Sequence, residues 1–256
     1  MNIPLKRLLV GGVMIAFATL PHALPTPSEP APAEPAPANN DSRQIRVQVE
    51  FIELAHEQFT ALMSAEHPAA NDGTLRKQVG ELVANSKATI VESMLCTAKH
   101  GQTSKSESIE EFIYPTEFEP SQIPAHPNNG TGIMTIEPHD PAVGPTASAW
   151  ETRNLGSTLE IQPSLSDDNK LVNLRLVPEL VYHVGNQLWS EWKDAHGTAN
   201  VQTPTFYTLR LNTRVVTGVD EYLLAAALSP KNKDGFPDFS RKVMVFVKCD
   251  VLSSAR

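Results

Sequence analysis

The residues that could carry out chemistry are few and scattered in this 256-residue chain. His100, His126, His139, His183 and His196 follow no spacing that is typical of metal ligands, so surface or core histidines are the simpler interpretation. The sequence contains no G-x-S-x-G, no H-E-x-x-H and no glycine-rich phosphate loop. We therefore expect no enzyme, no metal site and no cofactor.

Two groups of side chains come nearest to an active site. Glu110-Glu111 and Glu117 with Glu119 flank Tyr114 and could act as paired carboxylates, but a solvated strand and loop explain them more simply. Trp189 and Trp192, in QLWSEWKDAHG, could form a sugar platform with the nearby acidic residues Glu191 and Asp194. Aromatic residues at a barrel rim or at a subunit contact explain the tryptophans equally well.

The two cysteines, Cys96 and Cys249, are the remaining candidates for covalent chemistry. Each lies in an apolar, strand-like run, IVESMLC or VMVFVKC. An exported chain permits a disulfide between them, while two buried free thiols are the competing interpretation. The sequence leaves both open, because a disulfide requires Cα atoms within about 7 Å of each other.

The N-terminus predicts export. Lys6 and Arg7 precede the apolar run 8–15, and Ala16-Phe17-Ala18 forms an A-x-A cleavage signal, so residues 1–18 are a predicted signal peptide. The apolar run is shorter than the roughly 20 residues that span a bilayer. Residues 19–42 hold seven prolines between positions 21 and 37 and are a predicted extended tether.

The net charge of −8 indicates which partners to exclude. A nucleic-acid partner requires a basic face, and a polybasic membrane anchor requires a basic cluster. Neither fits this composition, and we expect no nucleic-acid partner.

The folded part, predicted over residues 43–252, alternates short apolar-patterned segments with turns. Helices are predicted over 55–64 and 74–85, and long loops over 115–145 and 185–203. Segments 88–98 and 106–115 are predicted to form a hairpin through residues 99–102. The other predicted strands cover 45–54, 155–163, 171–184, 204–219, 221–229 and 242–252. The predicted fold class is therefore mainly β, with antiparallel strands and one or two packing helices.

Four ordered blocks of this folded part resemble the core domain of secretins, the multimeric outer-membrane channels of bacterial type II and type III secretion and of type IV pili. The first runs from IRVQVEFIEL through the predicted helix to Gly101 and Gln102. The second is ETRNLGSTLEIQPSLSDDNKLVNLRLVPELV, and the others are PTFYTLRLNTRVVTGVDEYLLAAAL and RKVMVFVKCDVL. The signature positions of the second block are Gly156, Leu159, Pro163, Leu174, Pro178 and Glu179.

The resemblance has gaps. Residues 225–227 are alanines where the family pattern has a glycine pair. The family's proline- and glycine-containing signature ahead of the last strand is reduced to Phe236-Pro237-Asp238.

The resemblance implies a structural component of an outer-membrane secretion or pilus channel that mediates protein export. It would be a homo-oligomer whose subunits share their strands in a barrel, with residues 155–163 and 204–219 at the contacts between subunits. It would work with other secretion or pilus assembly proteins. Arg210 and Arg214 would then face the lumen. The alternative is a soluble periplasmic or surface-associated interaction domain that kept the fold without forming a pore.

Overall fold

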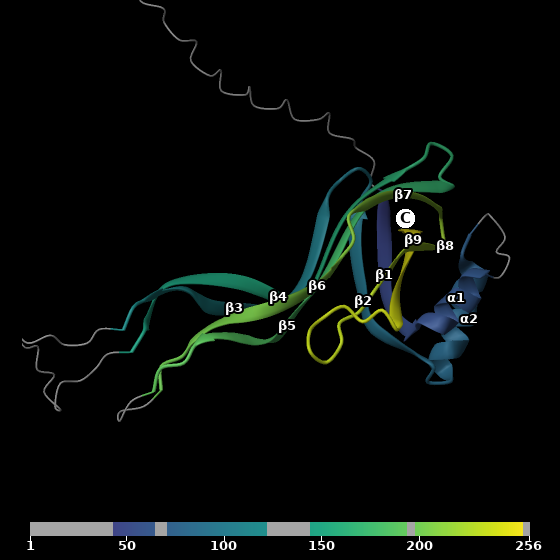
Figure 1. The fold of residues 1–256 in the computed structure, drawn as a ribbon. Coiled ribbons are helices and arrows are strands. Elements are labelled where there is room, and N and C mark those ends of the chain that lie inside the picture. The colour runs from purple at the N-terminus through teal and green to yellow at the C-terminus, as the bar shows by residue number, and fades with distance from the viewer. Residues whose placement is uncertain (1–42, 65–70, 122–143, 194–197, 253–256) are drawn as a thin grey trace, which may run out of the picture. The chain divides into compact units, whose positions relative to one another are not determined.

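The computed structural model describes residues 43–64, 71–121, 144–193 and 198–252 (Figure 1). The chain divides into two units, residues 1–38 and 39–256, and every element below belongs to the second. The predicted signal peptide and the whole of the predicted tether lie outside the described residues, as do His126, His139, Asp194 and His196.

The described residues form nine strands and two helices. The helices are α1 (His56–Ser64) and α2 (Gly73–Ala84), close to the two predicted segments. The strands, in chain order, are β1 (Gln44–Ala55), β2 (Ala88–Lys99), β3 (Ser104–Glu119), β4 (Thr146–Leu165), β5 (Leu171–Ser190), β6 (Val201–Arg210), β7 (Thr213–Gly218), β8 (Tyr222–Leu228) and β9 (Arg241–Leu252).

The strands make two antiparallel sheets. Sheet A has the order β2-β1-β9-β8, and sheet B has the order β3-β4-β5-β6. Strand β7 continues the line of β6, because both pair with β5 at successive positions. The predicted fold class, mainly antiparallel β with two helices, is confirmed.

The predicted hairpin between 88–98 and 106–115 is wrong. Strand β2 pairs with β1 in sheet A, whereas β3 pairs with β4 in sheet B. The turn 99–102 therefore crosses from one sheet to the other. It is held against β4 by Gly101, whose N–H donates to the carbonyl of Pro163 at 2.8 Å.

Two predicted loops contain strand instead. Strand β3 continues to Glu119, inside the predicted loop 115–145, and β5 continues to Ser190, inside the predicted loop 185–203. The flanking prolines and polar residues concealed these extensions, because pairing along a long hairpin does not require an apolar face on either side.

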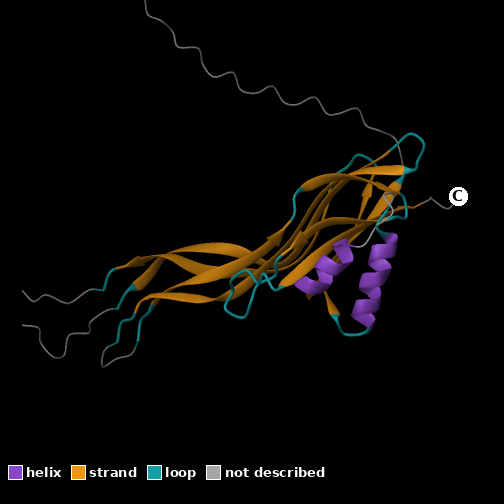
Figure 2. Cartoon of the chain, turned by 45° about the vertical axis from the view of Figure 1, so that its right-hand side comes forward, coloured by secondary structure: helices purple, strands orange, loops and turns teal. Residues whose placement is uncertain are grey.

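The core lies between the two sheets. Alternate side chains of β1 and β9, such as Val47 and Val245, meet those of β4 and β5, such as Leu159 and Leu174, and all four are fully buried. The opposite face of sheet A is covered in part by the helices, with Leu75 and Val79 packed among a second apolar cluster. Figure 2 shows both helices on this side of the strands.

An ion pair joins α2 to sheet A. The Arg76 guanidinium donates to both carboxylate oxygens of Glu50, at 2.6 and 3.0 Å, and the Glu50 residue is only 6% exposed. The Arg76 group also lies 5.6 Å from the centre of the Tyr222 ring. The hydrogen bonds that Arg76 donates to Glu50 raise the pKa of Arg76, so the guanidinium stays charged at neutral pH.

Arg76→Ala is expected to lower the free energy of unfolding by about 3–5 kcal/mol, because it leaves the Glu50 carboxylate buried without a cation, with only the 3.3 Å hydrogen bond that the Gln48 amide donates. Lys77→Ala, one residue further along the same helix at an exposed position, is the matched control. Urea unfolding followed by circular dichroism measures both. A similar, small loss in the two variants would show that the ion pair does not tie the helix to the sheet.

Candidate assembly interface

Sheet B ends on two strands, β3 and β6, whose outer sides have no partner strand among the described residues. Strand β3 pairs with β4, and β6 and β7 pair with β5. Such edges present free N–H and C=O groups to other chains. Because the five-stranded sheet is four antiparallel strands wide, with β7 in line with β6, β3 and β6 run in opposite directions. Strand β3 of one copy can therefore extend the antiparallel pattern on β6 of another.

The edge of sheet A at β8 is different, because the start of α2 covers it. The N–H of Asp72 donates to the carbonyl of Tyr222 at 2.9 Å, and the N–H of Leu224 donates to the Asp72 carboxylate at 2.7 Å. These bonds occupy the backbone groups that another strand would use. The start of β8 is therefore closed to another strand, and the pair of open edges that match each other belongs to sheet B.

The face of sheet B that points away from sheet A is charged. Glu107, Thr158, Glu179 and Arg210 are successive partners across β3, β4, β5 and β6 and so form one row. The Arg210 guanidinium donates to the Glu179 carboxylate at 2.5 Å, and Arg210 has 57% of its side chain exposed. The sheet presents water-compatible side chains on this face.

The two arginines predicted to face a lumen lie on this charged face. Arg214 is exposed, stands opposite Arg175 on β5, and makes no ion pair among the described residues. Arg175 in turn forms an ion pair with Glu160 on β4. The predicted pair of arginines therefore shares one surface, although only Arg210 has an acidic partner there.

The glycines of the resemblance have positive φ angles. Gly101 has φ 74° in the turn between the sheets, where Gln102 donates its N–H to Lys99 at 3.0 Å. Gly156 has φ 111°, and a Cβ there would collide with the carbonyl oxygen of Ser108 on β3. A glycine at 156 is what lets β3 approach β4 so closely.

The apolar and proline positions of the resemblance hold sheet B together. Leu159 is fully buried between the sheets and stands opposite Pro178. Pro178 has no N–H to donate, and its carbonyl accepts from Leu211 at 3.1 Å, at the break between β6 and β7. Pro163 stands opposite Leu174 at the other end of the same strands.

Beyond Gly156 the sheet divides into two hairpins. The pairing of β4 with β5 ends at Gly156 and Val181, but β3–β4 and β5–β6 continue as separate pairs (Figure 2). An aromatic cluster joins the two hairpins. Phe112 of the first stacks on His183 of the second with ring centres 4.8 Å apart, and Phe206 meets Phe112 edge-on at 6.0 Å.

The far parts of both hairpins expose large apolar side chains. Trp150 and Ile113 on the first hairpin are 59% and 63% exposed, and Trp189 and Leu188 on the second are 67% and 44% exposed. The Trp189 indole N–H donates to the hydroxyl of Thr203 at 2.7 Å, which fixes its ring. Exposed tryptophans of this kind are typical of membrane interfaces and of protein contacts.

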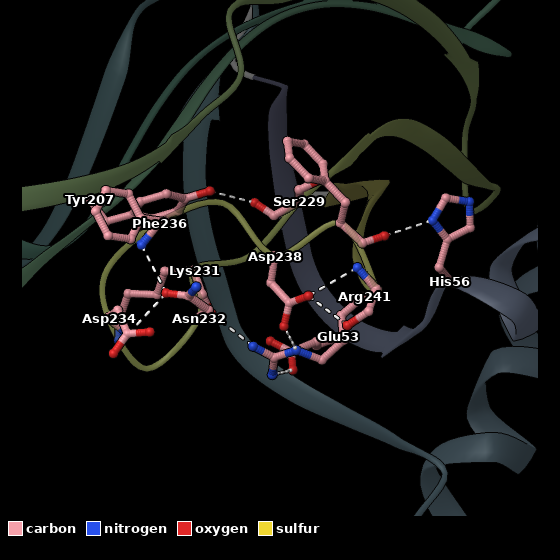
Figure 3. Close-up of polar contacts among 12 residues, drawn as sticks. Glu53, His56, Tyr207, Ser229, Lys231, Asn232, Asp234, Phe236, Asp238 and Arg241 are labelled. Atoms are coloured by element: carbon pink, nitrogen blue, oxygen red, sulfur yellow. Dashed lines mark hydrogen bonds and ion pairs between the residues drawn. The ribbon is translucent and has the colours of Figure 1, made fainter.

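The loop between β8 and β9 was missed by the sequence analysis as an ordered feature (Figure 3). The side-chain oxygen of Asn232 accepts the N–H groups of Asp234 and Phe236, both at 2.9 Å. The dipeptide Asp234-Gly235 was the available signal, because it marks a turn. The loop holds Phe236 and Phe239 at the surface, 67% and 71% exposed.

The end of the same loop is anchored to sheet A (Figure 3). Arg241 donates to Asp238 at 2.8 Å and to the carbonyl of Lys231 at 2.8 Å, and it also pairs with Glu53 of β1. Hydrogen bonds from Ser240 and Arg241 lower the pKa of Asp238 to about 2. The Asp238 carboxylate therefore stays charged throughout the neutral pH range.

Cys96 and Cys249, for which the sequence left a disulfide and two free thiols open, do not form a disulfide in this structure. Both cysteines stand opposite Val47 of β1, Cys96 on one side in β2 and Cys249 on the other side in β9. Two strand spacings separate them, about 10 Å between Cα atoms, which is too far for a bridge. Both thiols are free and buried. The competing interpretation, two buried thiols, describes them.

Within the described ranges, no three His, Cys, Asp or Glu side chains gather in a way that could hold a metal ion. In the same part of the chain, no helix is long and apolar enough to cross a membrane.

Comparison with known proteins gives matches among solved structures alone: no family model and no curated protein matches the sequence. The type II secretin GspD of enteropathogenic Escherichia coli is 12% identical, with a TM-score of 0.40 over 83% of this chain and 70% of that chain. InvG of the Salmonella SPI-1 type III injectisome is 8% identical, with a TM-score of 0.40 over 84% of this chain and 66% of that chain.

A third match is PilQ, the type IV competence pilus secretin of Vibrio cholerae, which is 11% identical. Its TM-score is 0.33, over 82% of this chain and 61% of that chain. The solved structures to which this chain is similar are thus secretins, the family that its sequence blocks resemble.

Proposed function

We propose that this chain is a structural subunit of a ring-shaped protein-export channel in the outer membrane of a bacterium. The observation that carries the proposal is that sheet B has four antiparallel strands and ends on two open edges, β3 and β6, that can pair with each other. A ring of copies joined in this way leaves no edge open, which is how a barrel avoids unpaired strands. The ordered sequence blocks that resemble secretins support the role as a channel.

The exposed aromatic residues support a membrane location. Trp150 and Trp189 lie on the far parts of the two hairpins, and both are more than half exposed. In a closed barrel, such residues form belts at the boundary between lipid and water. In this proposal the hairpins approach the membrane, while Arg210 and Arg214 remain in the water of the lumen. The role is structural, with no catalytic step, and other secretion or pilus assembly proteins are the partners.

The test is the size and location of the full-length protein. After mild detergent extraction, native mass spectrometry is expected to find a complex of many copies, and the protein is expected to fractionate with outer membranes. Glu111→Cys on β3 combined with Thr205→Cys on β6 places two exposed thiols on the opposite edges. Oxidation is expected to give a ladder of cross-linked multimers.

Each single-cysteine variant is the matched control, and neither is expected to give more than a dimer. A protein that is a monomer in detergent and washes off membranes with salt would overturn the channel proposal. That result would leave the soluble or surface-associated interaction domain as the function.

A further inference from the structure

The two open edges of sheet B carry charges of opposite sign. Strand β3 contains one lysine and five glutamates, which are Glu107, Glu110, Glu111, Glu117 and Glu119. All five glutamates are exposed. Strands β6 and β7 contain no acidic residue and two arginines, Arg210 and Arg214, which are also exposed.

These charges are only partly neutralised inside one copy. Glu107 pairs with Lys105 at 2.7 Å, and Arg210 pairs with Glu179. Glu110, Glu111 and Arg214 make no ion pair among the described residues. Each edge therefore keeps a surplus of its own sign.

The register places one acidic residue and one basic residue of the two edges at the same height. Glu107 and Arg210 are the two ends of one row that crosses the sheet through Thr158 and Glu179. When β3 of one copy meets β6 of the next, acidic side chains approach basic ones on the same face. Strands in a barrel are staggered, so the individual partners depend on the offset, but the signs of the two edges do not.

Copies could in principle join in three ways: β3 with β3, β6 with β6, or β3 with β6. The first two are two-fold contacts that stop at a dimer, whereas the third is a head-to-tail contact that can close into a ring. Like charges opposite each other destabilise a strand pair, and opposite charges contribute about 0.2–1 kcal/mol each. A β3–β3 contact would bring two sets of five glutamates together.

We infer that the opposite charges of β3 and of β6–β7 select head-to-tail pairing of copies and exclude the two-fold dimer. This inference rests on the proposed function, since it concerns how the ring subunits recognise one another. The partner surface is thus a second copy of this chain, bound through its oppositely charged edge. Exposed charges are screened by salt beyond about 8 Å at physiological ionic strength, so assembly is expected to slow as salt rises.

Two edge-reversed variants test the inference. The first is Arg210→Glu with Arg214→Glu, which makes both edges acidic. The second is Glu107→Lys with Glu110→Lys and Glu111→Lys, which makes both edges basic. Each variant alone is expected to lose at least nine-tenths of the multimer seen by native mass spectrometry. An equimolar mixture is expected to recover it, because every contact then joins an acidic edge to a basic one.

Glu57→Lys with Glu81→Lys, at exposed positions on α1 and α2, is the control for charge reversal away from the edges: it changes the net charge by as much as the first variant, with the opposite sign, and is expected to assemble normally. Circular dichroism checks that each variant folds. If Arg210→Glu disturbs folding through Glu179, Thr205→Glu with Arg214→Glu makes the same edge acidic and keeps that ion pair. Full assembly of a single edge-reversed variant, or no assembly of a mixture of folded variants, would overturn the inference and leave the ring intact. Failure of the wild-type protein to form any multimer would instead overturn the proposed function.

Discussion

Gly156→Ala is expected to reduce the free energy of unfolding by about 2–6 kcal/mol and to weaken the pairing of β3 with β4. The residue has φ 111°, a conformation that costs an L-residue about 1–3 kcal/mol. The added Cβ would also collide with the carbonyl oxygen of Ser108 and lie 3.3 Å from the Cα of Ile109. Overpacking of this kind adds about 1–3 kcal/mol.

Gly101→Ala is the matched control. Gly101 also has a positive φ, 74°, but a Cβ there would meet no atom within 4 Å. The only cost that remains for Gly101→Ala is that of holding alanine at a positive φ, which lowers the free energy of unfolding by about 1–2 kcal/mol. Urea unfolding measures the two variants, and hydrogen exchange of the β3 amides locates the damage. Equal losses in both would show that the close approach of β3 to β4 at residue 156 is unimportant.

Position 156 matters beyond stability, because the two hairpins separate there. Pairing between β4 and β5 ends at Gly156 and Val181, and the second hairpin has its own glycine of positive φ at 185. The stack of Phe112 on His183 then rejoins the hairpins further out. Displacing β3 at 156 therefore alters the edge that the proposed ring uses, and we expect Gly156→Ala to reduce assembly as well.

The strands that line the core were predictable because burial leaves a period-two signature. Val47 and Val49 alternate with polar residues in β1. In the neighbouring strand β9, Val247 stands opposite Val49, and Val245 is buried as well. Helix α2 was predictable because burial also leaves a pattern in a helix: Leu75 and Val79 recur at helical spacing, and both are buried.

The sequence could not show how the strands are distributed between sheets. A turn such as 99–102 ordinarily joins two paired strands, and nothing in its residues reveals that β2 and β3 join different sheets. The long strands outside the core were missed because both of their faces are exposed. The residues of the missed parts, such as Glu117 and Gln187, carry no apolar alternation.

Only part of the proposed interface between copies was predictable from the sequence. Residues 204–219 were expected at a subunit contact and do form an open edge, as β6 and β7. Residues 155–163 were expected there too, and this is wrong, because β4 is paired on both sides. Their apolar residues are buried by sheet A, which a sequence pattern cannot distinguish from burial by a neighbouring copy.

The buried thiols give the second large expected effect. In the native protein, Cys249 is expected to react with iodoacetamide at pH 8 roughly a thousandfold more slowly than in the unfolded chain. Burial raises the pKa of its thiol from 9.0 to about 12, and each pKa unit reduces the reactive thiolate about tenfold. Cys249 is fully buried in the core between the two sheets, so a reagent reaches its thiol only when the fold opens.

Leu95→Cys is the matched control, because Leu95 is 54% exposed on the outer strand of the same sheet and should react quickly. Denatured, non-reduced protein is expected to show two alkylatable thiols by mass spectrometry. A 2 Da deficit would establish a disulfide and contradict the separation of Cys96 and Cys249 on either side of β1.

The raised pKa of the Cys249 thiol also predicts that the folded protein loses stability at alkaline pH. The unfolded thiol ionises first, near pH 9.0, while the folded thiol holds its proton to about pH 12. The stability that the Cys249 thiol contributes is therefore complete below pH 9 and is lost as the pH rises from 9 to 12. The loss can reach about 4 kcal/mol, since each pKa unit corresponds to about 1.36 kcal/mol. Cys249→Ala is expected to be less stable at neutral pH, because it leaves a cavity, but to lose less stability than the wild type between pH 9 and pH 12. Parallel losses in the two proteins over that range would show that the thiol of Cys249 ionises as readily in the fold as outside it.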